Sequence, residues 1–311
     1  MNMQADFFTK NTSGILVQLP MPKILGEMTA PYENLGKMMN KGIELSLSYG
    51  NYITNKNQLN YNLGVNFSYI ENEVTKFRKD APDQLYLIRE GYSYQTLYGY
   101  KAIGIYQSDE EAKKHMHANS PSPKAGDIKY QDVNNDGKLD FEDKQGIGNT
   151  IPKINYGITA KLYYKGFDLN ILFQGIAGAY LFTQNQYTTL TLDRQTTTKK
   201  WLNAWTPENT NTNIPRLLLN SDWNQSQSSF WMHKSDFLKL RNIQFGYTIS
   251  KKITSKFNLE KVYLFGNVQN VYTMMMHKGY EGFDPERAST GDGGSVYPVP
   301  RIFSVGVNIN F

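Results

Sequence analysis

Phe303-Ser304-Val305-Gly306-Val307-Asn308-Ile309-Asn310-Phe311 is the stretch of sequence that decides the fold. Its Phe, Val and Ile side chains fall on one face of an extended chain, and its Ser, Gly and Asn residues fall on the other without exception. This period of two predicts a β-strand with one apolar face. The opposite face is small and uncharged, which suits a strand whose apolar side meets lipid.

The same alternation recurs upstream and predicts seven more strands. The clearest is 59–69, in which Leu, Tyr, Val and Phe alternate with Asn, Gly and Ser over eleven residues. A tilted strand needs about 9–11 residues to cross a bilayer, whereas strands of soluble domains are mostly about 5–6 residues long. Length therefore favours membrane strands. The other predicted strands are 1–10, 43–49, 154–164, 167–173, 237–249 and 263–272.

Two local features of these strands are also predicted. Lys165-Gly166 lies between two of them and predicts a tight hairpin turn. Within 237–249 the apolar residues change parity in mid-strand. One extra residue near Arg241-Asn242 would produce this change, so we expect a β-bulge there.

The predicted strands are joined by short and long links in alternation. Outer-membrane barrels have short periplasmic turns and long extracellular loops, and placing Phe311 in the periplasm makes every long link extracellular. The predicted fold class is therefore all-β, an antiparallel transmembrane β-barrel of which about eight strands are present. The short links lie near 52–57, 164–166 and 250–260, and the long ones near 11–41, 73–152, 178–235 and 274–301.

The composition agrees with a barrel and excludes several other classes of protein. Aromatic residues make up 14% of the 311 residues, and barrels carry aromatic girdles at both membrane interfaces. The sequence contains no run of about 18 apolar residues, so it predicts no membrane-spanning helix. Cysteine is absent, which excludes disulfides and thiol chemistry. The net charge of +5 is scattered without a basic stripe, so nucleic-acid binding is not expected.

Neither an enzyme nor an export signal is predicted. No paired acids, Ser-His-Asp group or phosphate-binding glycine loop stands out, so we expect no catalytic residues. The segment 1–14 lacks the basic region and the apolar region of an export signal. We therefore expect the chain to be a fragment of a longer precursor.

The longest link, 73–153, is predicted to be an ordered extracellular insertion between barrel strands of the segment 1–311. Within it, Leu97–Tyr106 has the pattern of a strand, and Ser108–Ala118 has that of a short helix capped by Ser108. Such a large ordered insertion implies a structured cap over the mouth of the barrel.

The segment 132–143 of this insertion carries the one predicted metal site. It matches an EF-hand loop at positions 1, 3, 5, 6 and 9, with Gly137 at the sharp turn. Asp143 stands at position 12 in place of the usual bidentate Glu, and its shorter side chain is expected to weaken calcium binding. The alternative is a polar turn without an ion. The predicted Ca²⁺ ligands are Asp132, Asn134, Asp136, the Lys138 carbonyl, Asp140 and Asp143.

The histidine and tryptophan residues are predicted to have structural or surface positions. His115 and His117 lie two residues apart and face different ways on a helix, which disfavours a zinc pair, and His233 and His277 are expected on the surface. The tryptophans are expected to stabilise the loops rather than to stack on sugar rings; they are Trp201, Trp205, Trp223 and Trp231.

Several runs of sequence resemble the SusC/RagA family of TonB-linked outer-membrane transporters. They cover nearly the whole chain in order: GDIKYQDVNNDG at 126–137, IGN at 147–149, YYKGFDL at 163–169, FLKLRNI at 237–243, GNVQN at 266–270, GYEGFDPE at 279–286 and YPVPR at 297–301. The resemblance implies that these residues form the carboxy-terminal barrel part of a much longer protein, with about 22 strands around a plug.

The resemblance also implies a location and partners. The parent protein is expected in the cell outer membrane, where a SusD-like surface lipoprotein captures oligosaccharides or peptides and the TonB complex supplies the energy to import them. Two alternatives stay open. One is a small self-contained outer-membrane anchor or adhesin, because eight strands can close into a barrel. The other is a secreted calcium-braced carbohydrate-binding β module.

Overall fold

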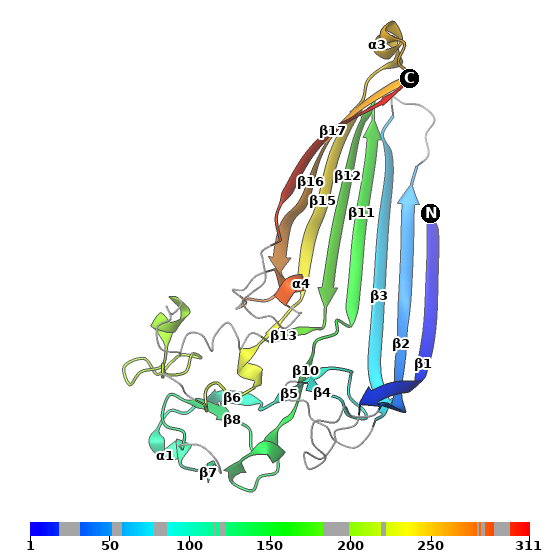
Figure 1. Ribbon diagram of the computed structural model, residues 1–311. Helices are drawn as coiled ribbons and strands as arrows, with labels where there is room; N and C mark the ends of the chain where they lie inside the picture. Colours follow the sequence, from blue (N-terminus) through cyan, green and yellow to red (C-terminus); the bar gives the residue numbers. More distant parts are fainter. Residues whose placement is uncertain are drawn as a thin grey trace.

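The main body of the protein in the computed structural model is one antiparallel sheet of eight long strands (Figure 1). The strands lie across the sheet in sequence order, so each pairs with its neighbours along the chain. They are β1 Asn2–Gln18, β2 Tyr32–Gly50, β3 Asn60–Lys76, β11 Ile154–Tyr164, β12 Phe167–Ala177, β15 Phe237–Thr248, β16 Lys261–Met275 and β17 Ile302–Asn310. The structure describes residues 1–18, 32–51, 58–77, 86–114, 116–117, 122–182, 199–218, 222–278, 280, 284–288 and 299–311.

All eight predicted strands are present, and the predicted hairpin turn is confirmed. Tyr164 pairs directly with Phe167 across a two-residue turn. The turn residues Lys165 and Gly166 have φ angles of 49° and 90°, as the mirror-image turn that matches strand twist requires. Glycine tolerates this left-handed backbone without a steric penalty. The predicted turn at 52–57 lies outside the described residues.

The predicted bulge in β15 is also confirmed. Leu172 of β12 pairs with Asn242, but the next residue, Phe173, pairs with Leu240. Arg241 is therefore the extra residue, and the pairing with β16 is also irregular between Leu240 and Asn242. The bulge explains why the apolar residues change parity in the middle of the strand.

β1 and β2 extend well beyond their predicted ends. The link predicted at 11–41 is wrong at both ends, because β1 continues to Gln18 and β2 begins at Tyr32. The strands have 17 and 19 residues, whereas crossing a bilayer takes about 9–11. Their pairing continues past Gly14, whose φ is 70°. Outside the membrane no lipid enforces apolar alternation, so the sequence pattern ends before the strand does.

One face of the sheet presents apolar side chains that no other described part of the chain covers. Val305 is 91% exposed, Phe7 is 77% exposed and Phe303 is 72% exposed. In a soluble β-sandwich these side chains would lie between two packed sheets. The exposure therefore agrees with a face that contacts lipid.

The sheet is open in the described part of the chain. β1 and β17 form its two opposite edges and do not pair with each other. The eight strands thus form a segment of wall instead of a small closed barrel (Figure 1). Among the described residues, no helix has the length and apolar character needed to span a membrane.

The described residues of 86–149 and 180–235 form a second body, here called the cap, beyond one end of the sheet (Figure 1). Its elements are short: β4 Tyr86–Leu87, β5 Thr96–Gly99, β6 Ala102–Ile105, α1 Asp109–Ala112, β7 Met116–His117, β8 Ile128–Tyr130, β9 Lys138–Leu139, η2 Phe141–Asp143, β10 Gln145–Asn149, β13 Tyr180–Phe182, η3 Lys199–Asn203, η4 Ser229–Trp231 and β14 Met232–Lys234. Outside the cap lie α3 Lys251–Thr254, η5 Ser255–Phe257 and α4 Pro285–Ala288.

Two predictions for the cap need correction. The single strand predicted at Leu97–Tyr106 is divided between β5 and β6, which belong to different sheets. The division occurs at Tyr100, whose N–H donates to the Gln227 carbonyl at 2.9 Å. The helix predicted at Ser108–Ala118 is a single turn, α1, although Ser108 does cap it by accepting from the Glu111 N–H at 3.1 Å.

Candidate functional site

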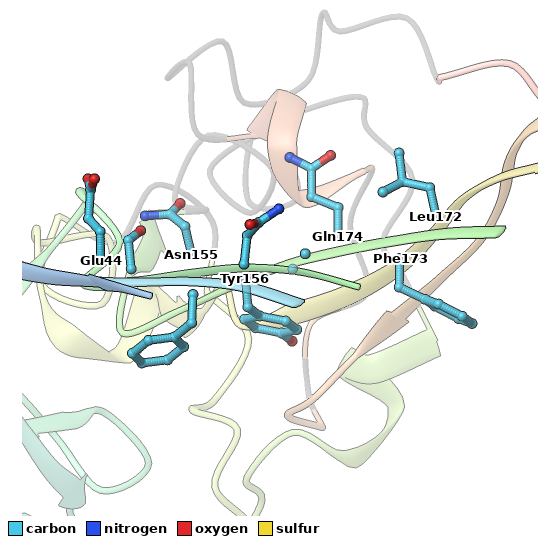
Figure 2. A pocket seen from close by; sticks show the side chains of 11 residues that line it. Glu44, Asn155, Tyr156, Leu172, Phe173 and Gln174 are labelled. Carbon is cyan, nitrogen blue, oxygen red and sulfur yellow. The ribbon is translucent and has the colours of Figure 1, made fainter. Parts of the chain in front are cut away.

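The polar face of the sheet carries a depression of about 390 Å³, lined by residues of β2, β3, β11 and β12. Figure 2 shows Glu44, Asn155 and Gln174 pointing to one side of the sheet, whereas Tyr156 and Phe173 point to the other. With Asn66, which also lines it, the depression offers one carboxylate, which accepts hydrogen bonds, and three amide groups, which both donate and accept them. Such a surface suits a polar solute.

Strand pairing and one glycine produce this depression. Gly157 pairs with Asn66 on one side and with Gln174 on the other. A Cβ atom at Gly157 would meet only the Phe173 carbonyl, at 3.7 Å, so the space above this position is open. The polar side chains around it are brought together by register because directly paired residues of a sheet point to the same face.

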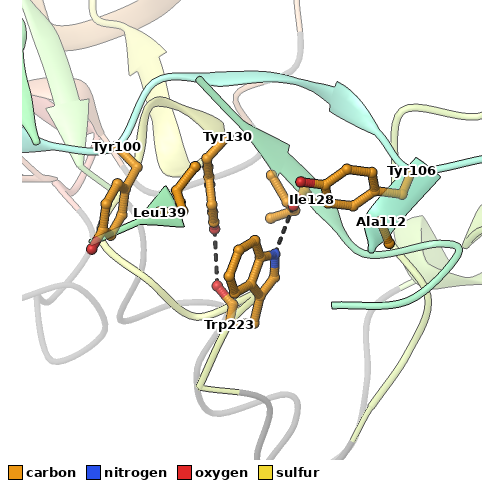
Figure 3. Packing of buried hydrophobic residues seen from close by; sticks show 7 residues of the cluster. All are labelled: Tyr100, Tyr106, Ala112, Ile128, Tyr130, Leu139 and Trp223. Atoms are coloured by element: carbon orange, nitrogen blue, oxygen red, sulfur yellow. Dashed lines mark hydrogen bonds between the residues drawn. The ribbon is translucent and has the colours of Figure 1, made fainter. Parts of the chain in front are cut away.

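The cap has an aromatic core (Figure 3). Its residues come from both segments that form the cap, the connection between β3 and β11 and the connection between β12 and β15. Trp223, from the second connection, donates its indole N–H to the Ile128 carbonyl at 2.7 Å. Its own carbonyl accepts from the Tyr130 hydroxyl at 3.0 Å. Burial raises the pKa of Tyr130 and raises that of Tyr100 to about 12, so both phenols stay neutral. The core residues are Tyr100, Tyr106, Ala112, Ile128, Tyr130, Leu139 and Trp223.

The four tryptophans are buried, as predicted for residues that stabilise the loops. Trp201 and Trp231 form a second cluster with Ala204. Each tryptophan is at most 9% exposed, which leaves little ring surface for stacking on a sugar. The cap is thus a folded body with its own interior.

The predicted calcium loop has the sharp turn that an EF-hand loop needs. Gly137 has a φ of 77°, which favours glycine. The Asp132 carboxylate accepts from the N–H groups of Asn135 at 2.7 Å and Gly137 at 2.9 Å. Asp132 therefore lies inside the turn.

Asp143, at position 12 of this loop, is fully buried and fastens both of its ends. One carboxylate oxygen accepts from the Val133 N–H at 2.8 Å, and the other accepts from the Asp140 N–H at 2.9 Å. In the described part of the chain, no group of three or more His, Asp or Glu side chains converges on a metal position. Calcium binding by Asp132, Asn134, Asp136, Lys138, Asp140 and Asp143 stays a prediction.

His233 differs from the surface position expected for it, whereas His277 agrees with that expectation. His233 in β14 is half-buried, and its ring lies edge-on to Tyr280 with centroids 6.0 Å apart. Burial, followed by the charge of Lys200, lowers the pKa of His233 to about 4. His277 lies on the surface, with Nε2 2.7 Å from the Asp236 carboxylate. His115 lies outside the described residues.

Comparison with known proteins gives relatives along the entire chain. No protein-family model matches it. TonB-dependent receptor P3 of Formosa agariphila is 29% identical over 337 residues, which cover 100% of this chain and 32% of the relative. TonB-dependent receptor SusC of Bacteroides thetaiotaomicron is 23% identical over 322 residues, covering 98% of this chain and 30% of the relative.

Solved structures give the same fold. The RagAB peptide importer in its open-open state superposes with a TM-score of 0.76 at 23% sequence identity, over 99% of this chain and 32% of that chain. The chain is related to the TonB-dependent receptors of the SusC/RagA family. It spans about a third of the length of the relatives that it matches.

This relationship gives both faces of the sheet an environment. The chain is a segment of an outer-membrane β-barrel, so the apolar face contacts lipid. The polar face, with the depression around Gly157, then lines the interior of the barrel. The residues of this depression were not singled out from the sequence as a site, because only strand register shows that four strands bring them together.

Proposed function

We propose that this chain is the carboxy-terminal part of the barrel of an active transporter, which imports oligosaccharides or peptides across the outer membrane with energy passed by TonB. The observation that carries the proposal is the open sheet with one lipid-facing side and one polar side. β1 and β17 have no pairing partner on their outer sides among the described residues, and they require further strands because an unpaired edge is not tolerated in the hydrocarbon region. A larger barrel with a wide polar interior satisfies this requirement.

The two alternative functions have less support. A self-contained anchor or adhesin needs eight strands that close on themselves, whereas β1 and β17 lie at opposite edges. A secreted carbohydrate-binding module needs a water-compatible exterior, whereas Val305 and Phe303 of the final strand are largely exposed. The transporter also agrees with the names of the relatives, which are TonB-dependent receptors.

We propose further that a SusD-like surface lipoprotein docks on the cap. The cap exposes Leu202 by 86% and Phe141 by 71%, and large exposed apolar side chains of this kind are common in contact surfaces. The structural relative RagAB is named a peptide importer. This name favours peptides over oligosaccharides as the substrate class to test first.

Gene deletion tests the proposed transport. Cells that lack the complete gene containing this segment would be given fluorescently labelled oligosaccharides and, separately, labelled oligopeptides. We expect loss of uptake for one of the two classes, recovery with the intact gene, and no recovery in cells without TonB. Unchanged uptake of both classes together with loss of surface attachment would support the adhesin instead.

Purification tests the proposed partner. The full-length protein extracted from outer membranes in mild detergent is expected to carry a surface lipoprotein, identified by mass spectrometry. A variant with both Phe141→Ser and Leu202→Ser is expected to lose it. Purification of the native protein without any lipoprotein would contradict this part of the proposal.

A further inference from the structure

A buried lysine lies on the polar face of β15. Lys239 is only 2% exposed, although lysine is among the residues least often buried. It pairs in register with Gln174, which points to the polar side of the sheet in Figure 2. Burying an ammonium group is costly unless it is paired with an opposite charge, so the partners of Lys239 define its role.

Both acidic partners come from the connection between β16 and β17. The Lys239 ammonium lies 2.6 Å from the Asp284 carboxylate and 2.7 Å from that of Glu286. Arg241 adds a second positive group, 2.9 Å from the Glu286 carboxylate. The four side chains balance to zero net charge, which is the arrangement that makes buried charges tolerable.

The bulge in β15 allows two basic residues to share one acidic partner. Lys239 and Asn242 both lie on the polar face, and Arg241 is the extra residue between them. Without this insertion Asn242 would face lipid. A bulge re-aims side chains in this way, and here it places Arg241 within reach of Glu286.

Glu286 belongs to α4 and Asp284 directly precedes it, and this helical turn lies over the polar face. In Figure 2 this helical turn is on the side of the sheet toward which Gln174 points. The Glu286 N–H donates to the Asp284 carboxylate at 3.0 Å, which presents both acids together to Lys239. Partial burial alone raises the pKa of Glu286, but the hydrogen bonds and charges of Lys239 and Arg241 outweigh it and lower this pKa below its ordinary value. Glu286 is therefore ionised at neutral pH.

We propose that Lys239 and Arg241 form a latch that holds the segment 284–288 inside the barrel, beside Gln174, where it narrows the passage. Lys239 is then a positioning residue of the transport path. The effect on transport rests on the proposed function. The attachment of 284–288 to β15 does not depend on any substrate. Release of the latch would let the segment leave the wall and widen the passage.

Hydrogen exchange in the full-length protein tests the attachment. Lys239→Met removes the ammonium and keeps the length of the side chain, whereas Glu286→Gln acts from the other partner and leaves the strand intact. Both are expected to raise the exchange rate of peptides covering 284–288 tenfold or more, with peptides of β16 unchanged. Lys161→Met is the matched control, because Lys161 is an exposed lysine on the polar face of β11. It should leave the exchange rates of both sets of peptides unchanged.

Cysteine labelling tests the narrowing. The 311-residue chain contains no cysteine, so Gln174→Cys adds one defined thiol to this part of the protein, beside the latch. Polyethylene-glycol maleimide added outside intact cells is expected to label it at least threefold faster with Lys239→Met, whereas Glu44→Cys, at the far side of the depression, should keep its rate. Folded variants with unchanged exchange at 284–288 would overturn the latch. Raised exchange with unchanged labelling at Gln174 would overturn the narrowing, and neither result depends on whether uptake is observed.

Discussion

Arg216 and Asp127 lie 89 residues apart in the sequence and form a bidentate ion pair, with Nε 2.7 Å and Nη2 2.8 Å from the two carboxylate oxygens. The Asp127 side chain is 3% exposed, and it also accepts from the Asn224 amide at 3.0 Å and from the Lys124 N–H at 2.8 Å. These contacts join the two long connections of the chain, so the cap behaves as one body.

Arg216→Ala is expected to destabilise the cap by about 2–4 kcal/mol, because it leaves a buried carboxylate without its charged partner. Asp127→Asn should cost less, since Arg216 is partly exposed and water can solvate it. Limited proteolysis of the full-length protein in detergent measures the difference. Arg89→Ala, at an exposed arginine of the same connection, is the control and should leave the cleavage rate unchanged. Equal rates for all three variants would contradict a structural role for the pair.

The sequence is sufficient to predict the barrel strands because lipid imposes a strict pattern on them. Each lipid-facing position must be apolar, and the alternation of Val305 and Ser304 expresses this directly. The ends of β1 and β2 could not be predicted, because these strands continue where no lipid demands alternation. Only the pairing of Gln18 with Tyr32 places their ends.

The sites could be predicted only where their residues are contiguous. The sharp turn at Gly137 follows from a local motif, and the structure contains it. The partners of Lys239 lie 45 and 47 residues away, and no spacing rule connects a strand lysine with a loop acid at that distance. Burial of His233 was missed for the same reason, since Lys200 and Tyr280 reach it from separate connections.

Calcium is expected to bind at 132–143 and to stabilise the cap. Isothermal titration of the full-length protein with calcium chloride measures this, with weak affinity expected because Asp143 replaces a bidentate Glu. Asp136→Asn and Asp140→Asn should abolish the heat of binding, whereas Glu110→Gln, at an exposed acid of α1, should preserve it. A titration without heat, and without a shift in the thermal unfolding of the cap, would favour a turn that holds no ion.

Acid is expected to loosen the cap through His233. Its pKa is lowered from 6.5 to about 4 in the folded protein, so between these values the unfolded chain binds more protons than the folded one. Stability is therefore full above pH 6.5 and falls as the pH decreases toward 4. Hydrogen exchange of peptides covering β14 should become faster from neutral pH to pH 5, after correction for intrinsic exchange. His233→Asn should remove this dependence; its persistence would assign the effect to another group.

Gly175→Ala is expected to lower the folding yield of the barrel. A Cβ at this position would meet the ring of Tyr156, whose hydroxyl donates to the Phe237 carbonyl at 3.0 Å. Neither the ring nor the backbone beside it can move without breaking that bond. Gly266→Ala is a matched control on the apolar face, because a Cβ there meets nothing within 4 Å. The heat-modifiable fraction on gels reports the folded barrel, and equal losses for the two variants would contradict this packing.

Lysine at Val305 is expected to destabilise the barrel in lipid, whereas lysine at Ser304 is expected to be tolerated. Val305 is 91% exposed on the apolar face and pairs with Gly266 in the middle of β17, while Ser304 points to the polar side. A lysine facing lipid near the bilayer midplane costs about 2–4 kcal/mol, and one that faces an aqueous interior costs little. Guanidinium unfolding of both variants from phospholipid vesicles measures the difference. If Ser304→Lys were the more damaging change, the two faces would be assigned the wrong way round. The depression around Gly157 would then face lipid, which offers no hydrogen-bond partners to its amide and carboxylate groups.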